Sequence, residues 1–247
     1  MLSFHDVVVA FGALRAVGGV SFTVPAGERR AVIGPNGAGK TTLFDAATGV
    51  IRATAGRIVF GGRDITRLQA HRRAALGMSR TFQINNLFPT LTVGDNVALA
   101  VRAIGRRKFA LLGSPRLEVA EAARIASVLT VVGLGGHAAR LVAELSYGEQ
   151  RQLELALALA GEPRLLMLDE PAAGLSPAER GMLAAIIRAL PRDLTLVLIE
   201  HDMDLVLGVA DRVTCMHEGR VLAEGTPDAI RTDPRVREVY LGRPRHA

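Results

Sequence analysis

The stretch Gly34-Pro-Asn-Gly-Ala-Gly-Lys-Thr-Thr42 decides the fold of this chain. It fills the pattern G-x-x-x-x-G-K-[ST] without a mismatch, and the β-type run Arg30–Ile33 leads into it. Glycines let the backbone turn its N–H groups inward around an anion, and a helix expected from Lys40 onward adds partial positive charge. The stretch therefore predicts a nucleoside triphosphate site in an α/β core. The alternative, a glycine-rich turn with a chance lysine, is disfavoured by the flanking strand and helix.

The residues of this loop have separate expected roles. Lys40 places a point charge on the β- and γ-phosphates, Thr41 offers its hydroxyl to Mg²⁺, and Thr42 can donate to an inner phosphate oxygen. The nucleotide contacts expected here come from Gly34, Pro35, Asn36, Gly37, Ala38, Gly39, Lys40, Thr41 and Thr42.

A second motif, Leu165-Leu-Met-Leu-Asp-Glu170, is an apolar run that ends in two carboxylates. In open α/β folds ligands bind at the carboxyl ends of the strands, so Asp169 is expected beside the nucleotide. We expect Asp169 to hold Mg²⁺ through a water, and Glu170 to orient and deprotonate the water that attacks the γ-phosphate. A solvated strand end is the alternative, and the intact phosphate loop upstream disfavours it.

Length and composition limit the class of protein. A chain of 247 residues fits one large α/β domain with a smaller lobe inserted. The net charge of +6 permits nucleotide, acidic lipid or nucleic acid as partners, but the basic residues are dispersed, so no nucleic-acid partner is expected. The single cysteine, Cys215, excludes an internal disulfide and is expected to be a buried, inert thiol. No apolar run approaches the roughly 20 residues of a membrane span, and no signal peptide is expected.

Short β-type runs alternate with helical patterns along the chain. Several runs are apolar throughout, which is typical of strands covered on both faces in a mostly parallel sheet. The expected strands are Val7–Ala10, Val20–Val24, Arg30–Ile33, Arg57–Phe60, Leu165–Leu168, Thr195–Ile199 and Val213–Met216. The expected helices are Lys40–Gly49, Gly148–Ala160 and Pro177–Leu190, and residues 88–160, approximately, are expected to form a helical lobe inserted into the core.

The peptide Leu145-Ser-Tyr-Gly-Glu-Gln150 resembles the signature of the ATP-binding-cassette (ABC) family. Taken alone, a Ser-x-Gly helix start is more often an ordinary N-cap. The resemblance implies that Ser146, Gly148 and Glu149 cap the ATP of a second chain, so that two chains close head-to-tail around two MgATP. Tyr147 and Glu149 depart from the family's glycine and glutamine, and Ser176 stands where many members carry aspartate in a loop that crosses the dimer interface.

The same resemblance assigns three further residues. Phe11 stands where the family carries an aromatic that stacks on adenine, although a core phenylalanine is an equal alternative. Gln83 resembles the glutamine that contacts Mg²⁺ and the attacking water, and His201 resembles the histidine that touches the γ-phosphate. The implied catalytic residues are Lys40, Gln83, Glu170 and His201, and the implied metal ligands are Thr41, Gln83 and Asp169.

Finer features resemble the ATPase subunits of importers for branched-chain and related hydrophobic amino acids or amides. They are Arg80-Thr-Phe-Gln83, Leu87-Phe-Pro89, Ala172-Ala-Gly-Leu-Ser-Pro177, Ile199-Glu-His-Asp-Met203, Glu238-Val-Tyr-Leu-Gly242 and an insertion at Ile104–Pro115. The resemblance implies a single ABC ATPase domain with a P-loop NTPase core (1–87 and 161–247), an N-terminal antiparallel β part and an inserted helical subdomain (approximately 88–160).

The implied partners follow from this family. They are a second ATPase subunit, identical or related, integral-membrane permease subunits and, indirectly, a substrate-binding protein, with the chain on the cytoplasmic face of the cell membrane. An exporter ATPase is the nearest alternative, because the core motifs do not encode the direction of transport. DNA-repair, chromosome and translation ATPases of the family are disfavoured, because this chain has one cassette whose motifs lie close in sequence. A non-hydrolysing cassette is disfavoured by Lys40, Asp169, Glu170 and His201.

Overall fold

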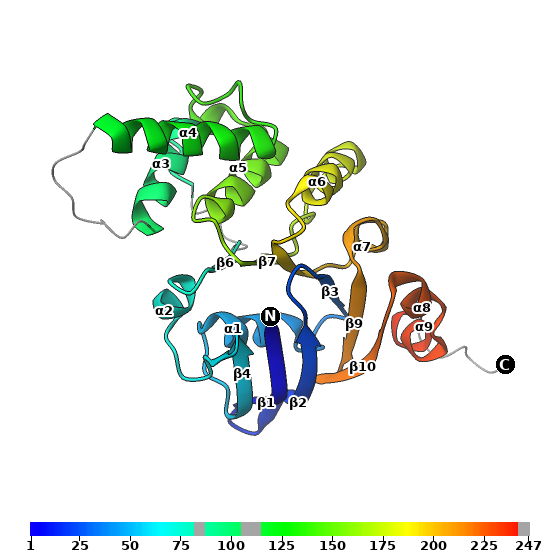
Figure 1. Cartoon of the computed structure of the whole chain (residues 1–247). Helices are drawn as coiled ribbons and strands as arrows, with labels where there is room; N and C mark the ends of the chain where they lie inside the picture. The colour runs from blue at the N-terminus through cyan, green and yellow to red at the C-terminus, as the bar shows by residue number, and fades with distance from the viewer. Residues whose placement is uncertain (82–86, 105–114, 242–247) are drawn as a thin grey trace.

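The central sheet of the protein carries the phosphate loop. In the computed structural model, which describes residues 1–81, 87–104 and 115–241, its strand order is β10-β9-β3-β8-β7-β6 (Figure 1). All neighbours are parallel except the edge pair β9 and β10. The strands are β3 (Arg29–Ile33), β6 (Met78–Arg80), β7 (Leu165–Asp169), β8 (Thr195–Ile199), β9 (Arg212–His217) and β10 (Arg220–Gly225). Every residue of β3, β7 and β8 is buried, as their apolar sequences predict.

A second, antiparallel sheet is built mainly from the N-terminal strands. Its order is β2-β1-β4-β5, with β1 (Leu2–Phe11), β2 (Leu14–Val24), β4 (Ala55–Phe60) and β5 (Arg63–Asp64). The predicted fold class, an α/β core with a mostly parallel sheet, a helical insertion and an N-terminal antiparallel part, is confirmed.

The helices fall into two groups. Helices α3 (Val93–Ile104), α4 (Pro115–Val131) and α5 (Tyr147–Leu159) lie together to one side of the sheets (Figure 1). The remaining helices lie about the sheets: α1 (Lys40–Thr48), α2 (Ala70–Ala74), α6 (Pro177–Ala189), α7 (Met203–Val209), α8 (Pro227–Thr232) and α9 (Pro234–Leu241). The expected limits of the helical subdomain, at 87/88 and 160/161, remain predictions. Within the described ranges, no helix is both long and apolar enough to cross a membrane.

Strand β3 lies between two hydrophobic cores. Ala31 and Ile33 belong to the core formed with the helical lobe, α6 and α7, whereas Val32 belongs to the core formed with the antiparallel sheet and α1. Because successive side chains of a strand point to opposite faces, five residues are enough to join both cores. The loop that follows β3 therefore starts from a strand fixed on both faces.

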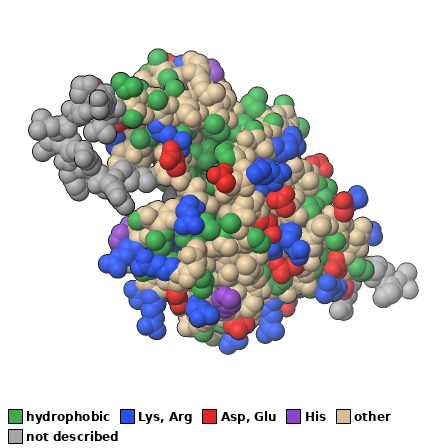
Figure 2. Space-filling model, viewed as in Figure 1, with side chains coloured by type: hydrophobic (Ala, Val, Ile, Leu, Met, Phe, Trp, Pro, Cys, Tyr) green, Lys and Arg blue, Asp and Glu red, His purple; other side chains and the backbone are tan. Residues whose placement is uncertain are grey.

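Charges are unevenly distributed on the surface. On the face drawn in Figure 2, basic and acidic side chains are interspersed at the right, whereas basic side chains gather at the lower left, where Figure 1 places α2 and β4. On this face, the side with α2 and β4 would attract a negatively charged partner more strongly than the mixed region at the right.

Candidate nucleotide-binding site

The site is assembled at one edge of the central sheet. The phosphate loop follows β3, Asp169 and Glu170 stand at the end of β7, and His201 follows β8. These three strands are parallel neighbours, so their carboxyl ends meet at the same edge. The topology therefore brings together motifs that lie far apart in sequence.

The phosphate loop depends on glycines at two close contacts. Gly34 has φ +149°, and a Cβ there would lie 2.2 Å from the carbonyl oxygen of Met216. Gly39 has φ +92°, and a Cβ there would lie 2.4 Å from the carbonyl oxygen of Ala16. Gly39 is also the N-cap of α1 and provides no side-chain cap, so this helix end keeps N–H groups available for an anion.

Lys40 lies inside the loop that it serves. Its Nζ donates to the carbonyl oxygens of Gly34 at 2.7 Å and Pro35 at 3.0 Å, and the residue is 5% exposed. Burial lowers the pKa of Lys40, and the nearby carboxylates of Glu170 and Asp169 act in the opposite direction. The predicted catalytic lysine and the two predicted acidic residues thus share one electrostatic environment.

Asp169 forms a buried ion pair. Its side chain is wholly buried, and its Oδ2 accepts a hydrogen bond of 2.6 Å from Nη2 of Arg80, at the end of β6. Burial raises the pKa of Asp169, and the bond to Arg80 opposes that rise. The other oxygen, Oδ1, is buried and has no hydrogen-bond partner in the described part of the chain. Carboxylate oxygens of this kind are the ligands that hard cations prefer, so the chemistry of Oδ1 fits the predicted metal site.

Glu170 and His201 contact each other directly. His201 Nε2 lies 2.9 Å from Glu170 Oε1, and both side chains are about one-third exposed, at 38% and 30%. Glu170 has φ +48°, which non-glycine residues seldom adopt, and its N–H donates to the carbonyl oxygen of Ile199 at 3.0 Å. A partly open carboxylate beside a histidine is suited to proton transfer.

The signature peptide begins α5 with a reciprocal cap. Ser146 Oγ accepts from the Glu149 N–H at 3.2 Å, and Glu149 Oε2 accepts from the Ser146 N–H at 2.7 Å. Gly148 faces the first turn of α6, where a Cβ on Gly148 would lie 2.4 Å from Glu179 Oε1. Hydrogen bonds from Ser176 lower the pKa of Glu179, and the backbone of Gly148 adds to this effect.

Other predicted residues differ in how the structure places them. Phe11 ends β1 and is 54% exposed, so the alternative of a core phenylalanine is wrong, whereas its role at adenine stays a prediction. Thr41 is exposed and Thr42 is half-buried, both in the first turn of α1. Gln83, most of the predicted insertion Ile104–Pro115 and Gly242 lie outside the described residues. Cys215 is buried, as expected, and burial raises the pKa of its thiol to about 11.

Sequence reasoning gave no role to two residues that contact this site. Arg80 was noted only within a family motif, yet it binds Asp169 and also pairs with Asp45 of α1. Glu200, the residue before His201, is 3% exposed and accepts backbone hydrogen bonds from Ala172, His201 and Asp202. A sequence signal for Glu200 was available, because a carboxylate directly after four buried apolar residues seldom occurs without a structural reason.

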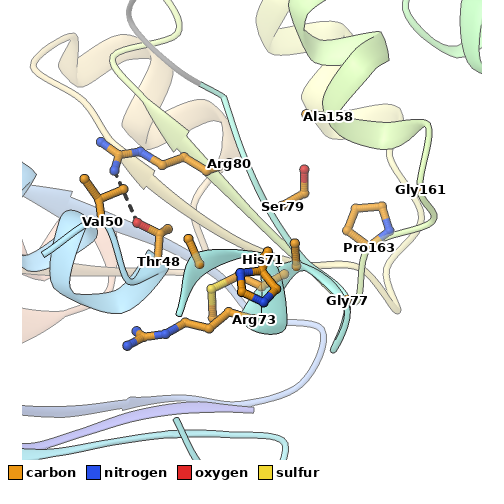
Figure 3. Close-up of a pocket in the computed structure, with 13 residues that line it drawn as sticks. Thr48, Val50, His71, Arg73, Gly77, Ser79, Arg80, Ala158, Gly161 and Pro163 are labelled. Carbon is orange, nitrogen blue, oxygen red and sulfur yellow. Dashed lines mark hydrogen bonds between the residues drawn. The ribbon is translucent and has the colours of Figure 1, made fainter. Parts of the chain in front are cut away.

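A groove lies beside Arg80, where α2, β6 and the end of α5 meet (Figure 3). Its volume is about 300 Å³, and its lining is mostly apolar with a basic border. The lining includes Val50, His71, Arg73, Met78, Ser79, Ala158 and Pro163, and Val50 is 55% exposed. The groove therefore connects the surface to the strand that carries Arg80.

Comparisons with known proteins agree on one family. A family model described as ABC transporter matches residues 17–173, and one described as branched-chain amino acid ATP-binding cassette transporter matches residues 220–246. The chain is 41% identical to the high-affinity branched-chain amino acid transport ATP-binding protein LivG of Salmonella typhimurium, and 40% identical to BraF of Pseudomonas aeruginosa. Each alignment covers 98% of both chains.

Solved structures show the same architecture. An ATP-binding cassette of an ABC transporter in its ADP conformation superposes with a TM-score of 0.83 at 29% identity, covering 98% of each chain. A nucleotide-free cassette superposes with a TM-score of 0.81 at 29% identity. The chain belongs to the ABC transporter family, whose ATP-binding subunits bind nucleotide and hydrolyse ATP to power transport.

Proposed function

We propose that this chain powers an importer for branched-chain or related hydrophobic amino acids or amides. The observation that carries the proposal is the 40–41% identity, over 98% of the chain, to branched-chain amino acid transport proteins. The match of residues 220–246 to the branched-chain family model supports the same substrate class. An exporter remains the alternative, since the hydrolytic site serves transport in either direction.

Nucleotide binding is proposed to use the loop from Gly34 to Thr42. Backbone N–H groups and the N-terminus of α1 would surround the phosphates, and Lys40 would exchange its carbonyl partners for phosphate oxygens. Mg²⁺ would neutralise phosphate charge, and the described residues that would hold it are Thr41 and Asp169, whose Oδ1 is buried without a partner. Gln83 is proposed as a further ligand from the sequence alone, and Phe11 as the adenine contact.

Hydrolysis is proposed to begin at Glu170. Its carboxylate would accept a proton from the water that attacks the γ-phosphorus, as the bond to the β-phosphate oxygen breaks. The contact of 2.9 Å with His201 would hold the Glu170 side chain in one direction, and the imidazole would contact the terminal phosphate. Lys40 would stabilise the negative charge that develops on the leaving diphosphate.

The working unit is proposed to be a head-to-tail dimer. In it, Ser146 and Gly148 of one chain would contact the terminal phosphate held by the loop of the other. In the single chain, Ser146 caps α5, and Gly148 lies against the Glu179 carboxylate. Closure of the dimer would therefore replace Glu179 at Gly148 with a phosphate of higher charge.

The groove beside Arg80 is proposed to receive a permease subunit at the cytoplasmic face of the membrane. It offers apolar side chains such as Val50 and Met78 to a partner segment, and it adjoins the basic side of the molecule (Figures 2 and 3). Its wall includes Arg80, so a shift of the partner segment would be felt at Asp169. A substrate-binding protein would take part only through the permeases.

The deciding experiment is amino-acid uptake in the source organism. Deleting the gene should abolish uptake of radiolabelled leucine, isoleucine and valine at low external concentration, and the parent gene should restore it. A Glu170→Gln copy should not restore it, although it is produced at the same level. Unchanged uptake, together with impaired efflux of preloaded leucine, would assign the chain to an exporter.

A further inference from the structure

Glu200 links the two segments that carry Glu170 and His201. Its Oε1 accepts a hydrogen bond from the Ala172 N–H at 3.0 Å. Its Oε2 accepts from the N–H groups of His201 at 2.8 Å and Asp202 at 3.1 Å. One carboxylate therefore holds the loop after β7 and the loop after β8 at the same time.

A buried carboxylate at this position demands a reason. Glu200 is 3% exposed, and within the described ranges it forms no ion pair. Removing such a charge from water is unfavourable unless several donors satisfy its oxygens, and here three backbone N–H groups do so. A glutamine could accept through only one oxygen and would direct an NH₂ group at a backbone N–H. The arrangement thus requires a glutamate, because both carboxylate oxygens must act as acceptors.

The hydrogen bonds close a ring around the hydrolytic pair. Glu170 contacts His201 through side chains, Ala172 lies two residues after Glu170, and Glu200 joins Ala172 to His201. The Ala173 N–H donates to the Glu170 carbonyl oxygen at 3.0 Å, which folds this loop into a turn. Any loosening at Glu200 would change the separation of Glu170 and His201 without removing either side chain.

We infer that Glu200 is a positioning residue for ATP hydrolysis, which sets the geometry of Glu170 relative to His201. The inference rests on the proposed role of Glu170 as the base. Glu200 does not face the phosphate loop through any described contact, so nucleotide affinity is expected to be independent of it. Its effect falls on the hydrolytic step, because the distance between Glu170 and its water is most critical there.

Two conservative variants test this. Glu200→Gln keeps the size of the side chain but loses one acceptor oxygen. Glu200→Asp keeps the charge and can still accept from the Asp202 N–H, but its shorter side chain cannot reach the Ala172 N–H. Each should lower kcat for ATP at least about tenfold, while KM and the affinity for a fluorescent ATP analogue stay within roughly threefold. Glu224→Gln is the matched control, because Glu224 also accepts hydrogen bonds from a buried partner, Arg30, but lies in β10. It should lower the melting temperature and leave kcat unchanged.

Amide hydrogen exchange provides a second measurement that needs no turnover. Peptides covering 170–176 and 199–203 should exchange faster in both Glu200 variants than in the parent, and those covering α1 should not. If the parent chain hydrolyses no ATP, the proposed function fails while the exchange result still decides the structural part of the inference. The inference is overturned if exchange is unchanged, or if kcat falls only as much as the folded fraction does.

Discussion

Arg80 and Asp169 form a buried ion pair between neighbouring strands, with Arg80 Nη2 2.6 Å from Asp169 Oδ2. Arg80 ends β6 and is in register with Met167 of β7, so its side chain reaches two residues farther along the neighbouring strand. The guanidinium also pairs with Asp45 on α1. Arg80 therefore supplies the positive charge that a buried carboxylate requires.

Replacing Arg80 with alanine should destabilise the protein by about 3–5 kcal/mol, because Asp169 would be left as an unpaired buried charge. The matched change Asp45→Asn removes the other, more exposed partner, and should cost at most about 1 kcal/mol. Urea unfolding of both variants, with circular dichroism, measures the difference. Equal losses would mean that burial of Asp169 does not set the cost.

Replacing Glu170 with glutamine should reduce ATP hydrolysis about 100-fold or more, because the base that activates water is lost. ATP binding should persist, so the variant should accumulate as an ATP-dependent dimer in light scattering after size exclusion. Glu162 is an exposed acidic residue in the turn after α5, and Glu162→Gln is the control that should behave as the parent. Hydrolysis by Glu170→Gln at the parent rate would disprove the role of Glu170.

The loop glycines offer a matched pair of alanine substitutions. Gly37 and Gly39 both have positive φ, +81° and +92°, so each alanine should cost about 1–2 kcal/mol of backbone strain. Only at Gly39 would the new Cβ meet backbone, 2.4 Å from the Ala16 carbonyl oxygen. We expect Gly39→Ala to lose binding of a fluorescent ATP analogue and Gly37→Ala to retain most of it. Similar titration curves would contradict this prediction.

The variant Ser146→Ala should distinguish two roles of Ser146, the N-cap of α5 and the proposed contact with the ATP of a second chain. Losing the cap should lower the free energy of unfolding by about 1 kcal/mol. The N-cap Thr226 of α8 is a comparable residue away from the site, and Thr226→Ala should cost a similar amount. Only Ser146→Ala should also weaken the ATP-dependent dimer, measured in the Glu170→Gln background. A dimer of unchanged affinity would leave Ser146 as a helix cap alone.

The buried thiol of Cys215 should make the free energy of unfolding depend on pH. Burial raises its pKa from 9.0 to about 11, so the folded state holds the thiol proton more tightly than the unfolded state does. The resulting stabilisation is complete below pH 9 and is lost as the pH rises through about 11, to a limit of ~2.7 kcal/mol. The difference in unfolding free energy between the parent and Cys215→Ala, measured at pH 8 and pH 10.5, should shrink accordingly. A constant difference would show that the thiol does not titrate in this range.

Strong local patterns made most of the fold predictable. The buried strands β3, β7 and β8 begin and end within one residue of their predicted limits, because continuous apolar runs need cover on both faces. The short strand β6 was not predicted, since Met78-Ser-Arg80 has neither length nor β-branched residues, and only pairing with β7 makes it a strand. The edge strand β10 was missed because its charged ends obscure the alternation of its side chains.

The site was predictable as motifs but not as contacts. The phosphate loop and the Asp169-Glu170 pair lie together because parallel strands end at one edge, which the sequence order already indicates. The bonds of Arg80 to Asp169 and of Glu200 to Ala172 depend on which strands are neighbours, which no local pattern reveals. The exposure of Phe11 could not be predicted for another reason, because an aromatic residue beside a glycine fits a core as well as a surface.

The position of β3 between two cores gives the molecule a fixed frame of reference. Moving this strand would disturb packing on both faces at once, so the phosphate loop is the part of the machine least able to yield. Any movement that ATP hydrolysis drives must then appear as displacement of other segments relative to β3. Displacements of the other segments should thus be measured relative to β3.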